Sequence, residues 1–126
     1  MPYEISWQPL GVVYNFSGVV SDEDLCAATE EVNASPLLPA MKYLIADFSS
    51  IEKFDVSSVS VRMIANSDSR ASKTNPDVKV AIISASLFMR GMSNIYAITH
   101  QAAGGSWTTK VFQCEEDARA WAVPSS

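Results

Sequence analysis

The sequence has little of the side chains on which most enzyme chemistry depends. It contains one histidine, two cysteines and a charged fraction of 18%, where about 25% is usual. The cysteines, Cys26 and Cys114, form no CxxC pair and no cluster with histidine, so the sequence indicates neither a zinc site nor a disulfide framework. We expect reduced, buried thiols. Catalysis that needs a group of titratable side chains is disfavoured, and we expect no enzyme and no metal site.

Long apolar runs and recognisable targeting or nucleotide-binding signals are also missing. No apolar run approaches the roughly 18 residues needed to span a bilayer, and residues 1–4 lack a basic region followed by an apolar one. We therefore expect a cytoplasmic protein with no integral membrane association. Fourteen acids against nine bases give a net charge of −5, which disfavours nucleic acid as a partner. Without a GxSxG elbow, P-loop or GxGxxG, no cofactor is expected.

What the chain does have is enough apolar material for an independent core. It has 126 residues, of which 48% are hydrophobic. A chain of this size buries roughly two-thirds of its unfolded surface on folding. We therefore expect residues 1–126 to form a single domain, and every proposed function must fit one core.

The order of apolar patterns predicts an α/β fold. Tyr3, Ile5 and Trp7 alternate with polar residues, and a second apolar run follows Pro9, so residues 3–17 predict an antiparallel hairpin. Further strands are predicted at 43–46, 78–83 and 107–112, and helices at 55–75, 86–104, 115–123 and from Ser21 onward. The predicted order is β-β-α-β-α-β-α-β-α, with a mixed, mostly parallel sheet that helices cover on one face or on both.

The two middle helices differ in their apolar patterns. In helix 55–75 the apolar stripe fades after Ala65 and residues 66–70 are polar, so we expect its end to be solvated or frayed. In helix 86–104 the i, i+3, i+4 spacing predicts an inward face. That face consists of Phe88, Gly91, Met92, Ile95, Thr99 and Ala102.

Four large side chains lie close together near the start of helix 86–104: Phe88, Met89, Met92 and Tyr96. Residues of this kind at helical spacing are most often core. Because Met89 and Tyr96 lie off the predicted inward face, the group could also line an apolar pocket or form a partner surface. We therefore treat these four residues as a candidate apolar pocket.

Three titratable residues deserve separate consideration as an enzyme site. His100 falls late in helix 86–104, and we interpret it as a surface cation at the helix C-terminus rather than a catalytic base. Asp47 ends the predicted strand 43–46, and we interpret it as a turn aspartate that accepts from the amide of Ser49 or Ser50. A catalytic set of Asp47, Asp55 and His100 would require these groups to lie within hydrogen-bond reach.

The segment 47–59 is rich in hydroxyl groups and runs from a strand end into a helix start. We predict Asp55 as the N-cap, with Ser57 and Ser58 in the first turn, where backbone N–H groups are unpaired. Helix capping alone explains these residues. A phosphate on Ser57 or Ser58 would nevertheless be favoured by the unpaired donors and by the helix dipole.

This segment resembles the STAS domain family. Asp47-Phe48-Ser49-Ser50 is similar to that family's Asp-Leu-Ser-Gly, and the stretch from Phe54 to Val59 is similar to its Ile-Asp-Ser-Ser-Gly-Leu, with Val56 and Ser58 in place of serine and glycine. The predicted element order also fits, and helix 86–104 is more similar to the divergent SpoIIAA-like branch grouped with SEC14-type lipid-binding domains. In signalling antagonists of the family, the serine at the position of Ser57 is phosphorylated by a partner kinase. The resemblance therefore implies a SpoIIAA-like fold and a phosphoacceptor at Ser57.

Two functions follow as expectations. The first is a non-enzymatic regulatory domain that binds a protein partner, such as a kinase or an anti-sigma-type regulator, through Asp55, Ser57, Ser58 and the basic helix around Arg62 and Arg70. The alternative is a carrier or sensor for a small, lipid-like apolar ligand held under helix 86–104. An exposed edge at the N-terminal hairpin also makes a homodimer plausible.

Overall fold

The computed structural model describes residues 2–124 and confirms the predicted order of strands and helices. A short 3-10 helix, η1 (Leu38–Ala40), precedes the third strand and was not predicted. The strands are β1 (Tyr3–Gln8), β2 (Gly11–Ser21), β3 (Tyr43–Asp55), β4 (Lys79–Ile83) and β5 (Thr108–Phe112). The helices are α1 (Asp22–Asn33), α2 (Ser58–Thr74), α3 (Leu87–Ala102) and α4 (Glu115–Ala122).

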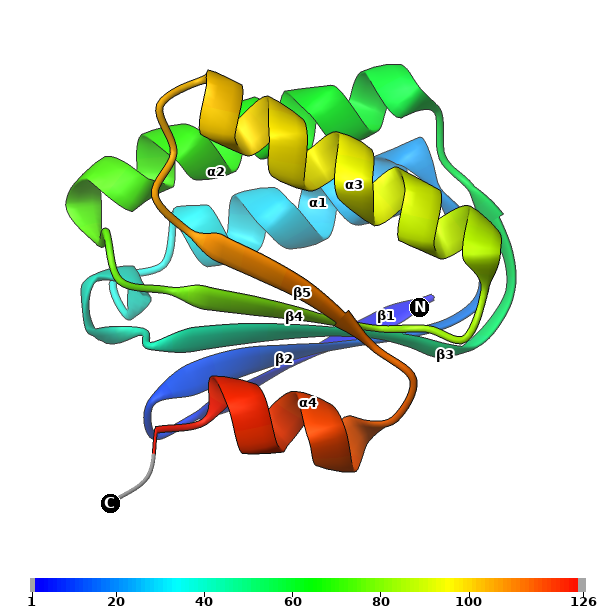
Figure 1. The fold of residues 1–126 in the computed structure, drawn as a ribbon, viewed down its shortest axis with the longest axis horizontal. Helices are drawn as coiled ribbons and strands as arrows, with labels where there is room; N and C mark the ends of the chain where they lie inside the picture. Colours follow the sequence, from blue (N-terminus) through cyan, green and yellow to red (C-terminus); the bar gives the residue numbers. More distant parts are fainter. Residues whose placement is uncertain (1, 125–126) are drawn as a thin grey trace.

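The strands form one mixed sheet in the order β1-β2-β3-β4-β5. The β1–β2 pair is antiparallel and every other pair is parallel, as predicted. Helices α1, α2 and α3 cover one face of the sheet, and α4 covers the other (Figure 1). The three crossovers advance in one direction along the sheet, and right-handed crossovers of that kind place their helices on the same face.

The N-terminal hairpin keeps the alternation read from the sequence. Glu4 and Ser6 are exposed, while Tyr3, Ile5 and Trp7 pack against the core beneath α1, α2 and α3. Because β1 ends the strand order, it is an edge strand. The homodimer through this edge stays a prediction.

Strand β3 is much longer than the predicted segment 43–46. It continues to Asp55 because its second half pairs with the end of β2, where Ser21 lies opposite Asp55. Two register shifts in β2, the second at Gly18 with φ of 65°, let the pair bend there. In Figure 1 this extension of β3 rises beyond the sheet toward the start of α2. Asp47 therefore lies within β3, not at its end.

The second half of α2 is packed, and the expectation of a solvated end was wrong. Asp68, Ser69 and Ser72 are buried, and the helix continues to Thr74. The hydroxyl groups of Ser69 and Ser72 donate to the carbonyls of Asn66 and Ser69, at 2.6 and 2.7 Å. Hydroxyls satisfied within the helix can be buried at little cost, and their small size suits them to the packed interface with α3.

Helix α4 closes a second, smaller core on the opposite face of the sheet. Ala118 and Ala122 are buried against Ile45 and Ile83, with Trp121 packed beside them, as the sequence predicted. Cys114 precedes this helix and is exposed, so its predicted burial was wrong, and Cys26 is only partly buried. Among residues 2–124, every helix is too short or too polar to cross a bilayer.

Candidate functional site

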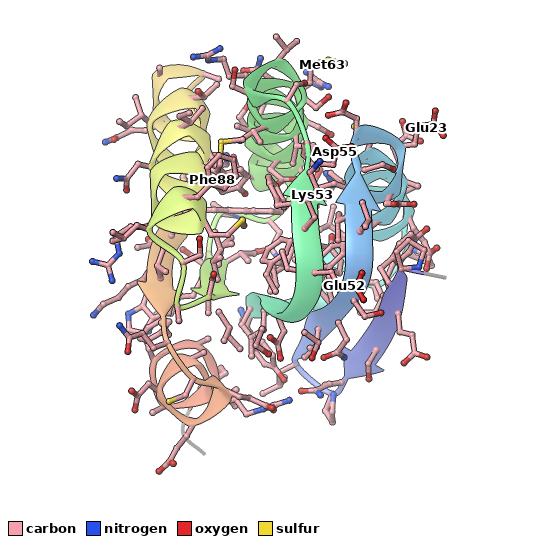
Figure 2. The ribbon with its side chains drawn as sticks, turned by 90° about the vertical axis from the view of Figure 1, so that its right-hand side faces the viewer. Glu23, Glu52, Lys53, Asp55, Met63 and Phe88 are labelled. Carbon is pink, nitrogen blue, oxygen red and sulfur yellow. The ribbon has the colours of Figure 1, made fainter. Side chains whose placement is uncertain are left out.

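The predicted interaction residues lie where the N-termini of α1, α2 and α3 open on one end of the molecule. We call the surface formed by these N-termini and by the last residues of β3 the end face. Figure 2 looks onto it: Lys53 and Asp55 lie at the tip of β3, with Glu23 from α1, Met63 from α2 and Phe88 from α3 around them. Residues distant in sequence therefore share one surface.

Ser57, and not Asp55, is the N-cap of α2. Its backbone is extended, and its hydroxyl oxygen accepts from the Ser60 amide at 3.2 Å. Asp55 is the last residue of β3 and is exposed. The prediction of Asp55 as the cap was wrong because pairing with β2 keeps the chain extended through Asp55. Ser58 is then the first helical residue and is only partly exposed.

Ser57 is tied to the start of α1 by an aspartate. The Asp22 carboxylate accepts from the Ser57 amide at 2.7 Å and from its hydroxyl at 3.3 Å. The backbone hydrogen bond from Ser57, with a further side-chain bond from Ser60, lowers the pKa of Asp22. A negative charge thus already occupies a donor at the α2 N-terminus, within reach of the Ser57 hydroxyl.

Three of the four candidate pocket residues do line a cavity between the sheet and the helices. The cavity has a volume of about 70 Å³ and an almost wholly apolar lining that includes Met89, Met92 and Tyr96. Phe88 lies outside it, with 57% of its surface exposed and its ring 6.2 Å from that of Phe54.

The inward face of α3 is displaced from the predicted one. The buried residues of the helix are Met89, Met92, Ser93, Tyr96 and His100. The predicted inward residues Phe88, Gly91 and Ala102 are exposed instead. Hydrophobicity misled the assignment because Ser93 and His100 occupy inward positions, where the Ser93 hydroxyl donates to the Met89 carbonyl at 2.7 Å.

A buried acid in the cavity wall was missed by the sequence analysis. Asp68 is 5% exposed, and its two carboxylate oxygens accept from the Tyr96 hydroxyl at 2.6 Å and from the Asn33 side-chain amide at 2.8 Å. These bonds join α1, α2 and α3. The available signal was spacing: Asp68 falls seven residues after Val61 and four after Ile64, on the buried stripe of α2.

Burial controls the protonation of Asp68 and its partner. It raises the pKa of Asp68 from its ordinary value of 3.8 to about 6, even though the hydrogen bonds from Tyr96 and Asn33 act in the opposite direction. Burial and the charge of Asp68 also raise the pKa of Tyr96 well above its usual range. Tyr96 therefore remains a donor throughout the physiological range.

His100 is a buried structural residue, and its interpretation as a surface cation was wrong. It is 1% exposed; its Nε2 accepts from the Trp107 amide at 3.0 Å, and its Nδ1 lies 3.3 Å from the Ala65 carbonyl. This pairing assigns the single proton to Nδ1. Burial lowers the pKa of the ring. Protonating Nε2 would break its bond to Trp107.

The residues considered as an enzyme site do not form one in the described structure. Asp47 accepts from the Ser49 amide at 2.9 Å, which confirms the predicted hydrogen bond, although Asp47 lies within β3 and not in a turn. Both nitrogens of His100 face backbone groups, and among residues 2–124 no hydrogen bond joins His100, Asp47 and Asp55.

Neither a protein-family model nor a curated protein matches this chain. Solved structures do. The unphosphorylated anti-sigma factor antagonist SpoIIAA is 13% identical, with a TM-score of 0.63 over 94% of both chains. Phosphorylated SpoIIAA, a Bacillus cell fate determinant, is 15% identical, with a TM-score of 0.58 over 94% of this chain and 96% of that one.

A third similar structure is an uncharacterized protein from Shewanella loihica with a SpoIIAA-like fold. It is 16% identical, with a TM-score of 0.54 over 95% of this chain and 91% of that one. At these identities, likeness establishes how the chain folds. The likeness extends over nearly the whole chain, and the predicted strand and helix order is present. The chain therefore has the SpoIIAA-like fold of STAS domains.

Proposed function

We propose that this chain is a non-enzymatic regulatory domain that binds a protein partner through the end face, with Ser57 as its phosphoacceptor. The observation that carries the proposal is the exposed Ser57 at the α2 N-terminus, on a surface with exposed apolar side chains. Leu87 is 83% exposed, Val59 62% and Met63 59%. Contiguous exposed apolar side chains among polar ones are typical of protein-binding surfaces.

The partner we propose is a kinase or an anti-sigma-type regulator in the cytoplasm. Two of the similar structures support this choice: one protein is an anti-sigma factor antagonist, and one structure is of a phosphorylated form. The basic residues Arg62 and Arg70 are exposed on α2, and we propose that the contact surface extends from the end face along α2 to include them.

Exposure and contacts favour Ser57 over Ser58 as the phosphoacceptor. Ser57 is exposed, whereas Ser58 is partly covered. A phosphate on Ser57 would compete with the Asp22 carboxylate for the Ser57 amide, because that amide now donates to Asp22 at 2.7 Å. Two anions cannot share this donor without repulsion. Phosphorylation would therefore break the contact between the starts of α1 and α2 and alter the surface that a partner meets.

Phosphopeptide mapping of the protein purified from its native cell tests the switch. We expect one phosphate per chain, on Ser57, in part of the population. Replacing Ser57 with alanine should remove it, while the matched variant Ser58→Ala should keep it. A chain that carries no phosphate at either serine under any growth condition would contradict the proposal that phosphorylation regulates this surface.

The cavity supports a second candidate function, the binding of a small apolar ligand under α3. Its volume of about 70 Å³ is well below the 300 to 1,000 Å³ typical of pockets for drug-sized ligands. A ligand of lipid size would need the helices to move apart. The cavity as it stands suits a molecule of only a few heavy atoms.

Native mass spectrometry with an organic extract of the purified protein tests this candidate. A ligand-binding role predicts a stoichiometric apolar species. The species should be lost in Ala46→Val, because Ala46 lines the cavity and a β-branched residue suits its strand. Ala120→Val, at an exposed position, is the control. A protein that releases nothing, with both variants alike, would count against ligand binding.

A further inference from the structure

The three helices on one face of the sheet divide the surface charge between them. Helix α1 carries five acids and no base: Asp22, Glu23, Asp24, Glu30 and Glu31. Helices α2 and α3 together carry four exposed bases: Arg62, Arg70, Lys73 and Arg90. Asp68 is the only acid in α2 and α3, and it is buried. In a chain with a net charge of −5, this layer therefore has one purely acidic and one purely basic side.

The basic side also carries exposed apolar residues. Along α2 the exposed positions follow one helical stripe that includes Arg62, Met63 and Arg70, opposite the buried stripe. Along α3 the corresponding stripe includes Leu87, Arg90 and Ile98. Leu87, Ile98 and Met63 are 83, 67 and 59% exposed. We call these six residues the basic–apolar surface; α2 and α3 lie side by side in Figure 1, with Met63 on the outer side of α2 in Figure 2.

The cations of this surface have no acidic partner. The one salt bridge among residues 2–124 joins Arg119 to Glu115 on α4. Guanidinium groups left exposed beside apolar side chains favour a ligand that supplies both carboxylates and apolar contacts.

We propose that the basic–apolar surface binds an acidic amphipathic helix of a protein partner. The inference rests on the proposed protein-binding function and specifies the chemistry of the partner. An amphipathic helix presents apolar residues three and four apart, flanked by charged ones, and it docks its apolar face on a complementary surface. Helix α3 has 16 residues and is about 24 Å long, which matches four to five turns of a partner helix.

The acids of α1 favour a helix over a flat anionic membrane. They lie in the same helical layer, so a planar surface laid across α2 and α3 would also approach the exposed carboxylates of α1, those of Glu23, Glu30 and Glu31. A single helix can lie along α2 and α3 alone. The charge of α1 would then repel it and hold it in that position.

Two synthetic amphipathic peptides test the proposal directly. They share the same leucine positions and differ in a polar face of glutamate or of lysine. Nuclear magnetic resonance titration of the whole labelled chain should show the glutamate peptide shifting amide signals of α2 and α3. The lysine peptide should produce no such shifts. The double variant Arg62→Glu, Arg90→Glu should bind the glutamate peptide about tenfold more weakly or worse.

Lys110→Glu is the matched control. Lys110 is exposed on β5, opposite Ala81, whose side chain belongs to the core beneath α4, so the change reverses a charge on the other face. We expect it to leave peptide binding unchanged. Equal binding of both peptides, no binding of either, or insensitivity to Arg62 and Arg90 would overturn the proposal. So would binding to phosphatidylglycerol vesicles, reduced by the double variant, without binding to the glutamate peptide.

The result separates this inference from the proposed phosphoswitch. Phosphate on Ser57 with no selective binding of the glutamate peptide would overturn the partner chemistry alone. Selective peptide binding by a chain that never carries phosphate would retain the surface and reject the switch.

Discussion

Replacing Asp68 with asparagine is expected to stabilise the folded protein by up to about 3 kcal/mol above pH 6. The pKa of Asp68 rises from 3.8 to about 6 on folding, and each unit corresponds to about 1.4 kcal/mol. The folded state therefore binds more protons than the unfolded state between these values. The contribution of Asp68 to stability is greatest below pH 4, falls as pH rises to about 6, and stays at its lower value above.

Asparagine does not titrate, so the variant should not show this loss. Its side-chain oxygen can still accept from the Tyr96 hydroxyl, and the Asn33 amide can turn to accept from the new amide group. Urea unfolding at pH 4 and pH 8 measures the effect: Asp68→Asn should be more stable than wild type at pH 8, and this advantage should be absent at pH 4.

The control for Asp68→Asn is Asp77→Asn, the same change at an exposed position on the loop before β4. It should leave the difference between pH 4 and pH 8 as in wild type. A variant at Asp68 that is less stable at pH 8 than wild type would contradict the prediction. It would show that charge-assisted bonds from Tyr96 and Asn33 outweigh the cost of burying the carboxylate.

Replacing His100 with alanine is expected to cost about 3 to 5 kcal/mol, as for other large-to-small changes in a core. The ring is buried between Tyr96 and Trp107, at centroid distances of 6.0 and 5.8 Å. Its loss also leaves the buried Trp107 amide without an acceptor, which by itself costs about 1 to 3 kcal/mol. Chemical unfolding at pH 7.5 measures the total.

The same substitution should change the dependence of stability on pH. Burial lowers the pKa of His100 in the folded state, so the unfolded state binds the extra proton more readily. The stabilisation is full above the ordinary pKa of 6.5 and is lost as pH falls toward the folded value. The stability deficit of His100→Ala relative to wild type should therefore be smaller at pH 5.5 than at pH 7.5.

His100→Gln is the informative comparison because a glutamine oxygen can accept from the Trp107 amide. It should recover part of the stability at pH 7.5 and should also lack the titration. If alanine at position 100 cost less than about 1 kcal/mol, His100 would not have the packing role that its burial indicates.

How much of the site could be predicted depended on whether its determinants were local. Ser21 illustrates the local case: its hydroxyl accepts from the Asp24 amide at 3.2 Å, and the run of acids after it predicted the start of α1. Asp55 illustrates the other. Its side chain is of a type that favours the N-cap position. Pairing with β2 extends β3 through Asp55, however, so Ser57 is the N-cap of α2.

Buried polar residues were the hardest to place. Asp68 falls in a polar stretch of its helix and His100 near the end of its helix, so the local pattern predicted that both side chains would be exposed to solvent. Each is buried because partners from other elements satisfy it: Asn33 and Tyr96 for Asp68, and the Trp107 amide for His100. The hydrogen bonds of Asp68 join it to residues that lie 28 and 35 positions away in the sequence and on other helices. Such contacts leave no local sequence pattern.

The sequence by itself determined the order of strands and helices, the antiparallel start of the sheet and the start of α1. These follow from alternation, helical spacing and capping, which act between residues a few positions apart. The tertiary structure alone decided the placement of α4 opposite the other helices, the start of α2 and the burial of Asp68 and His100. It also assembled the basic–apolar surface, because only packing brings α2 and α3 together and leaves their arginines on one face.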